Sequence, residues 1–112
     1  MELPKSQKKT ARLLINEGLQ RECRLHLQKV ESLLRNAKDK NELLHDTYLK
    51  LYEKVYDFDR HIAQIYDGMS GSRYFITITN LFCRGILTQE DISLFSEEVQ
   101  QAILRIKQRL EE

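Results

Sequence analysis

Three side chains that could bind a metal ion follow one another at four-residue spacing: Glu53, Asp57 and His61. Residues four apart lie on the same face of a helix, so these groups would project in one direction, but nearby lysines and arginines can pair with the same acids. Glu42 and His45 match one Glu-x-x-His motif of a di-iron bundle, whereas such a centre needs two. We therefore expect neither a metal nor any other cofactor.

A cysteine and a histidine raise the possibility of catalysis. Cys23 and His26 lie three residues apart, but no glycine-rich turn that could form an oxyanion hole accompanies them. The spacing of Arg21 and His26 is similar to the Arg and His pattern of HEPN-type ribonucleases, which are helical bundles of similar size. A pattern this short also arises by chance in a charged helix. We expect no enzymatic activity and keep a HEPN-like ribonuclease as the second alternative.

The main candidate for nucleic-acid binding is a group of four basic residues, Lys5, Lys8, Lys9 and Arg12. They share one face if this segment is helical. Residues 1–40 carry ten Lys/Arg against five Asp/Glu, a charge of +5, whereas residues 41–112 carry eight against twelve, a charge of −4. Because the net charge is only +1, attraction within the molecule explains this asymmetry first, and nucleic-acid binding is the alternative function.

Tyrosines at helical spacing indicate another kind of surface. Tyr48, Tyr52 and Tyr56 repeat every four residues, and Tyr66 follows later. Aromatic faces with a polar tip are favoured at protein interfaces, although packing in a core explains them equally well. We predict that Tyr52, Tyr56 and Tyr66 bind a protein partner. The expected function is that of a non-enzymatic helical interaction module, such as a small regulatory or adaptor protein.

A seam of fourteen residues, spaced alternately by four and three, indicates the elements that position these side chains. Its members are Cys23, Leu27, Val30, Leu34, Ala37, Asn41, Leu44, Tyr48, Leu51, Val55, Phe58, Ile62, Ile65 and Met69. All except Asn41 are apolar or aromatic, and a helix with this repeat presents a continuous stripe to a partner helix. The fold is therefore predicted to be all-α, with the seam inside a bundle and any functional surface outside it.

Two long helices account for this seam. Neither proline nor glycine occurs between Leu19 and Asp67, which favours long helices. We expect the first helix from about Ser6 to Asn36 and the second from Lys40 to Tyr66 or Asp67.

The break between these helices rests on a capping pattern. Asp39 can cap a new helix, and Glu42 stands three residues later, where it can reach back to the cap. The phase of the seam nevertheless continues unbroken through Ala37 and Asn41. One helix of some 60 residues, about 90 Å long and paired with another chain, is therefore the alternative to a hairpin.

The C-terminal third is predicted to add shorter helices. The segment Tyr74–Thr79 has strong β propensity, but no second strand signal exists to pair with it. A short buried helix is expected instead, capped by Ser72 and ended by Gly85 in a left-handed conformation. After it, Thr88 and Ser96 each offer a helix start, so this region is either one kinked helix or a short helix followed by a longer one.

The complete prediction is a single helical domain over residues 1–112. A long antiparallel hairpin and two shorter C-terminal helices would form a structure like a four-helix bundle. The long helices would extend past the short ones, which favours a homodimer. No transmembrane stretch and no secretory signal are evident, and Cys23 and Cys83 fit neither a disulfide scaffold nor a metal motif. We expect a cytoplasmic protein whose thiols are reduced and buried.

Overall fold

The computed structural model describes all residues, 1–112, and every regular element in it is a helix. In chain order these are α1 (Lys5–Asp39), α2 (Leu44–Tyr66), the 3-10 turn Gly71–Arg73, α3 (Tyr74–Cys83), α4 (Gln89–Ile92) and α5 (Glu97–Glu111). The prediction of an all-α fold is confirmed. The chain forms two compact units: the core unit, Met1–Leu19 with Gly68–Glu112, and the hairpin unit, Gln20–Asp67.

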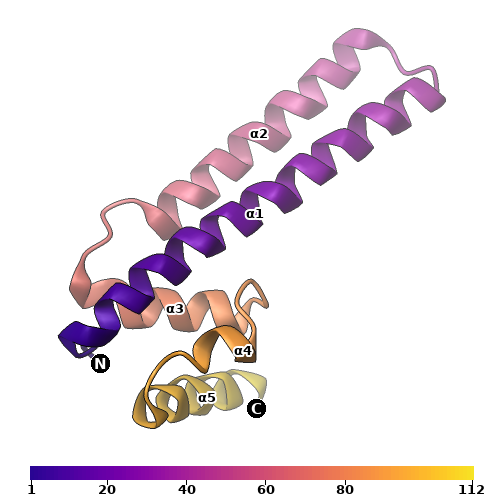
Figure 1. Cartoon of the computed structure of the whole chain (residues 1–112). Coiled ribbons are helices and arrows are strands. Elements are labelled where there is room, and N and C mark those ends of the chain that lie inside the picture. Colours follow the sequence, from indigo (N-terminus) through magenta and orange to yellow (C-terminus); the bar gives the residue numbers. More distant parts are fainter. The chain divides into compact units, whose positions relative to one another are not determined.

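In the hairpin unit, the second half of α1 and the whole of α2 run antiparallel beside each other (Figure 1). The predicted hairpin is therefore confirmed over the single continuous helix. Its helix boundaries differ from those predicted: α1 ends at Asp39 instead of Asn36, and α2 begins at Leu44 instead of Lys40. The end of α2 at Tyr66 agrees with the prediction.

The turn between α1 and α2 is built on Asn41. This residue has φ 53°, in the left-handed region that asparagine adopts more readily than most side chains. The N–H of Asn41 donates to the carbonyl of Lys38 at 3.1 Å, and that of Glu42 donates to the carbonyl of Ala37 at 2.8 Å. These two bonds form a Schellman motif, which ends α1 after Asp39. The predicted N-cap at Asp39 is therefore wrong, since that residue is the last of α1.

Glu42 has a different role from the predicted one. Its carboxylate accepts hydrogen bonds from the Thr47 hydroxyl at 2.8 Å and from the Lys50 ammonium at 2.5 Å. The hydrogen bond from Lys50, followed by that from Thr47, lowers the pKa of Glu42. These bonds tie the turn to the first turns of α2, whose N-cap residue, Leu43, supplies no side-chain hydrogen bond.

The core unit contains nearly all the buried apolar side chains of the protein. Seven of the ten residues of α3 are buried; α3 packs against α5 and belongs to the same compact unit as the first half of α1. The largest completely buried side chains are Ile78, Leu81, Leu87, Ile92 and Ile103. Polar contacts add to this packing: the Gln7 side chain accepts from the Ser96 N–H at 2.9 Å, and the Lys107 ammonium lies 4.8 Å from the centre of the Phe82 ring.

The ambiguous apolar segment is a buried helix, as predicted. Because α3 is covered by its neighbours, burial outweighs the β propensity of its residues. The N-cap position belongs to Arg73 after a 3-10 turn, so the predicted cap at Ser72 is wrong; its hydroxyl instead lies 3.0 Å from that of Ser70. At the other end, Gly85 has φ 78° and Ile86 donates to the carbonyl of Leu81 at 2.9 Å, which confirms the predicted left-handed ending.

The last third forms a short helix followed by a longer one. Thr88 and Asp91 make a complete capping box at the start of α4, and the Ser96 hydroxyl accepts from the N–H of Val99 at the start of α5. Both predicted starts are confirmed. The two cysteines are unpaired, but both are partly exposed, so the expectation that they are buried is wrong. None of the helices has the length and apolar character needed to cross a membrane.

Candidate functional site

The seam face of the hairpin unit is exposed, which corrects the prediction that the whole seam lies inside a bundle. We define the seam face by its most exposed members, Leu27, Leu34, Leu44, Tyr48 and Val55, whose relative exposures range from 46% to 88%. No residue of α2 is buried. Among the seam residues of α1, Ala37 alone is buried, and Cys23 and Val30 are half-buried.

The number of helices explains this exposure. At 3.6 residues per turn, the apolar and aromatic residues of α2 cover about 200° of its circumference, roughly twice the stripe that faces a single neighbour. The half-buried Leu51, Phe58 and Ile65 lie on the part of this arc that faces α1. The remainder, with Asp59 as its only Asp, Glu, Lys or Arg residue, has no helix of the hairpin unit to cover it.

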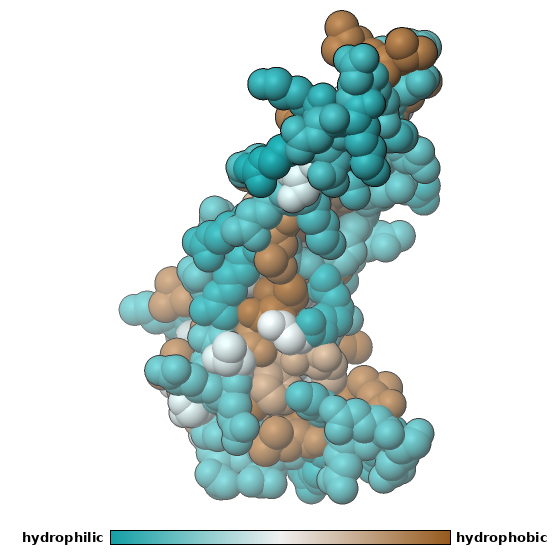
Figure 2. All heavy atoms as spheres, turned by 90° about the vertical axis from the view of Figure 1, so that its right-hand side faces the viewer, coloured by the Kyte–Doolittle hydropathy of each residue, from teal (hydrophilic) through white to brown (hydrophobic).

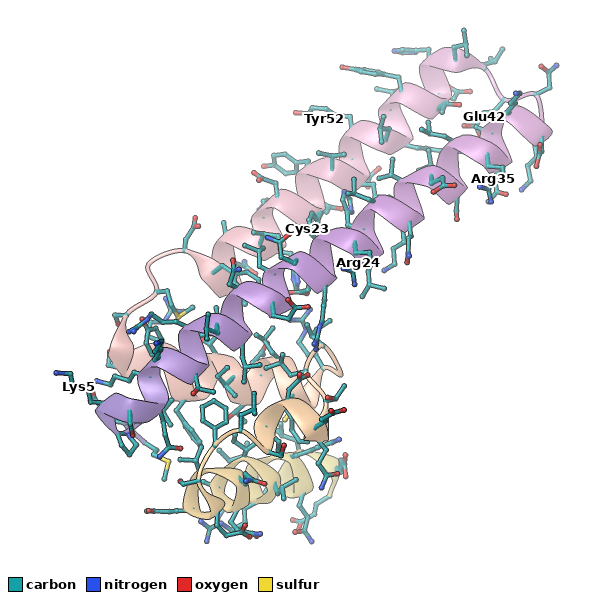
Figure 3. The ribbon with its side chains drawn as sticks, viewed as in Figure 1. Lys5, Cys23, Arg24, Arg35, Glu42 and Tyr52 are labelled. Carbon is teal, nitrogen blue, oxygen red and sulfur yellow. The ribbon has the colours of Figure 1, made fainter.

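The predicted tyrosines Tyr52 and Tyr56 lie beside the seam face, on the outer side of α2. Their rings and that of Tyr48 follow one another at centroid distances of 6.5 Å and 6.2 Å, and the Arg60 guanidinium lies 5.8 Å from the Tyr56 ring centre. Tyr52 projects away from α1 (Figure 3). All three tyrosines are at least half exposed, so the structure gathers them into one aromatic strip next to the apolar seam face.

The third predicted tyrosine, Tyr66, belongs to a different environment. Its hydroxyl donates to the carboxylate of Glu22 at 2.6 Å, and the His61 ring nitrogen Nε2 lies 2.8 Å from the other oxygen of that carboxylate. Glu22 is buried, with a relative exposure of 4%. Sequence analysis missed this network, because 39 and 44 residues separate Glu22 from its two partners and no local pattern joins them.

The opposite side of the hairpin from the seam face carries two grooves. A shallow groove of about 480 Å³ is bordered by two leucines, three uncharged polar side chains, Lys29 and Lys54, and a second one of about 340 Å³ by Leu33 and charged side chains that include Lys50, Glu53 and Asp57. Both are open rather than enclosed. The only charged residues that line the first groove are two lysines, whereas lysines and carboxylates alternate along the second.

The residues tested for catalysis do not converge. The His26 ring stacks on Phe58 of α2 at 4.0 Å between centroids and 3° between planes. A five-residue step turns a helix by about 140°, so Arg21 and His26 point to different sides of α1. The structure therefore gives the Arg and His pattern no shared face. Cys23, three residues from His26, is half-buried on the seam.

The environment of His26 leads to a prediction about pH. Burial against Phe58, followed by the nearby Lys54 and Lys29, lowers the pKa of His26 below its usual 6.5. The unfolded chain then takes up a proton that the folded chain does not, so this residue contributes stability above pH 6.5 that is lost as pH falls from that value through the lower pKa of the folded state. Urea unfolding should show a smaller loss of stability between pH 7.5 and 5.5 for His26→Phe than for the wild type. An unchanged loss would contradict the prediction.

The residues considered as metal ligands, Glu53, Asp57 and His61, are also separated. His61 bonds to Glu22, whereas Glu53 and Asp57 are exposed beside lysines. The structure does not gather three metal-ligating side chains into a cluster.

The basic residues at the start of α1 lie in the core unit. Lys5, Lys9 and Arg12 are exposed, but the Lys8 ammonium forms an ion pair with Glu2 at 2.7 Å and is only partly accessible. Lys5, Lys9 and Arg12 therefore present three unpaired basic side chains on one face of α1.

The hairpin unit therefore presents the largest apolar surface of the molecule. Figure 2 shows hydrophobic atoms open to solvent at the turn end of the hairpin, at the top of the view. Of the fifteen large apolar side chains that are exposed in the protein, ten lie in this unit. In comparisons with known proteins, no family model, no curated protein and no solved structure matches this chain.

Proposed function

We propose that the chain is a non-enzymatic protein-interaction module whose binding surface is the seam face, bordered by the aromatic strip of Tyr52 and Tyr56. The observation that carries this proposal is that α2 has no buried residue, although its apolar arc is wide enough for two neighbouring helices. Contiguous apolar surface of this kind marks interaction sites in soluble proteins. The partner supplies at least one amphipathic helix, because the exposed residues repeat at helical spacing.

The proposal can be tested by photo-crosslinking in cells that produce the full chain. A photoreactive amino acid in place of Tyr48 should give a discrete covalent adduct, whose intensity falls when Val55→Glu is added. The matched control carries the same amino acid in place of Leu13, which lies on α1 in the core unit and is 65% exposed. That control should give no adduct. Absence of an adduct at Tyr48, or equal adducts at both positions, would contradict the proposed function.

A further inference from the structure

We propose that the helices which cover the seam face are those of a second copy of this chain. Two hairpin units would pack seam face against seam face into a four-helix bundle, with their turns at the same end. In this arrangement α1 of each copy lies against α2 of the other. The inference rests on the proposed function, since it names the occupant of the same surface.

The seam face offers apolar surface for such a dimer, since its five defining side chains are 46–88% exposed. A standard protein interface covers about 800 Å² on each partner. A second copy also brings an apolar face of the same kind, as a two-fold interface requires.

Two unpaired charges support this orientation. Arg24 and Asp59 each come directly after a seam residue and are exposed, and neither forms an ion pair within its own chain. Arg24 projects from the side of α1 that faces away from α2 (Figure 3). In helical bundles, positions that flank the apolar seam pair across neighbouring helices and select partner and orientation.

The register within the hairpin places these two charges at the same height. Glu22 contacts His61 and His26 stacks on Phe58, so the residue numbers of facing pairs add to 83 or 84. Rotation about a two-fold axis parallel to the helices leaves every residue at the same position along the axis. Residues of different copies whose numbers add to about 83 therefore lie at the same height, and Arg24 and Asp59 are such a pair. Arg24 of one copy therefore lies opposite Asp59 of the other, and this pair occurs twice in the dimer.

The opposite orientation, with the turns at different ends, fits less well. It would pack α1 against α1, so that the acid nearest to Arg24 on the flank of the facing α1 is Glu31. The carboxylate of Glu31 already binds the Arg35 guanidinium at 2.6 Å within its own chain. Asp59 would then remain without a partner. The parallel orientation instead pairs Arg24 with Asp59.

Sedimentation equilibrium of the full chain tests whether a second copy covers the seam face. The wild type should have twice the 13.3 kDa mass of one chain, and Leu27→Glu should raise the dissociation constant by about 100-fold or more, because it buries a carboxylate in the interface. Leu13→Glu is the matched control, since both leucines lie on α1 and are 65% exposed. It should leave the dimer intact. A monomeric wild type, or equal effects of both variants, would overturn the proposal.

Mixing two charge-reversed chains tests the orientation. Arg24→Glu and Asp59→Arg should each weaken self-association about tenfold, because each places like charges opposite one another twice. An equimolar mixture should regain wild-type affinity, because both contacts of the mixed dimer then join opposite charges. A mixture that stays as weak as its components would overturn the parallel orientation. A monomeric wild type that still gives the Tyr48 adduct, at a mass other than twice that of the chain, would refute the second copy alone and leave the proposed function standing.

Discussion

Replacing Leu81 with alanine is expected to lower the free energy of unfolding by about 2–5 kcal/mol. Leu81 is completely buried in α3, at the centre of the core unit. Truncation removes apolar contacts and leaves a cavity that the surrounding helices fill only in part. The backbone carbonyl of Leu81, which accepts from Ile86 and Leu87 at the helix end, is not altered by this change. The measured loss therefore reports on side-chain packing. Since small proteins are stable by only about 5–15 kcal/mol, this single change removes a large part of the total.

The control for this prediction is Ile76→Ala in the same helix. Ile76 is 66% exposed, so its truncation should cost less than about 1 kcal/mol. Urea unfolding followed by circular dichroism, at one fixed protein concentration, compares the two variants. Equal losses would contradict the location of the core in α3 and its neighbours.

Glu22→Ala is expected to have the second largest effect, a loss of about 2–3 kcal/mol. The carboxylate is buried and binds both the Tyr66 hydroxyl and the His61 ring. Its removal deprives these two groups of this charged acceptor and creates a cavity between α1 and α2. Because the His61 side chain is 36% exposed, water replaces part of what it loses, which keeps the effect below that of breaking a fully buried ion pair.

Two further variants separate the causes of this loss. Glu22→Gln keeps the volume and an acceptor for Tyr66, so it should cost about 1 kcal/mol, less than the alanine variant. Glu31→Ala removes a carboxylate whose ion pair with Arg35 is exposed, and it should change stability by less than about 1 kcal/mol. The same unfolding measurement applies. A loss for Glu22→Ala no greater than that for Glu31→Ala would show that the buried network does not stabilise the hairpin.

Signals confined to a few neighbouring residues were predicted correctly from the sequence. Thr88 and Asp91 form their capping box, and Gly85 takes the left-handed conformation, because each depends only on residues in the same turn. The error at Asp39 has the same local origin. The spacing makes Asn41 a polar member of the seam, whereas an asparagine at this point is also a common left-handed residue after a helix. That second possibility would have placed the turn correctly.

The features that matter for function depend on longer distances. The periodicity of the seam predicts an apolar stripe, but it does not say how many helices cover that stripe, so the exposure of Leu27 and Val55 could not be predicted. The contact between Glu22 and His61 requires the register of the two helices, which no local pattern specifies. The spacing of Tyr52 and Tyr56 predicts that they bind a partner. Both side chains are exposed and lie next to the proposed binding surface.

The central claim is that the seam face is covered by a second copy of the chain. Its most direct test is an isotope-filtered nuclear Overhauser experiment on a mixture of carbon-13-labelled and unlabelled protein. In such a sample only contacts between different copies give signals. We predict signals between the Leu27 methyl groups of one copy and the Val55 methyl groups of the other, which lie at the same height in the parallel dimer. At millimolar concentration, the absence of any signal from the seam methyl groups between copies would contradict the account.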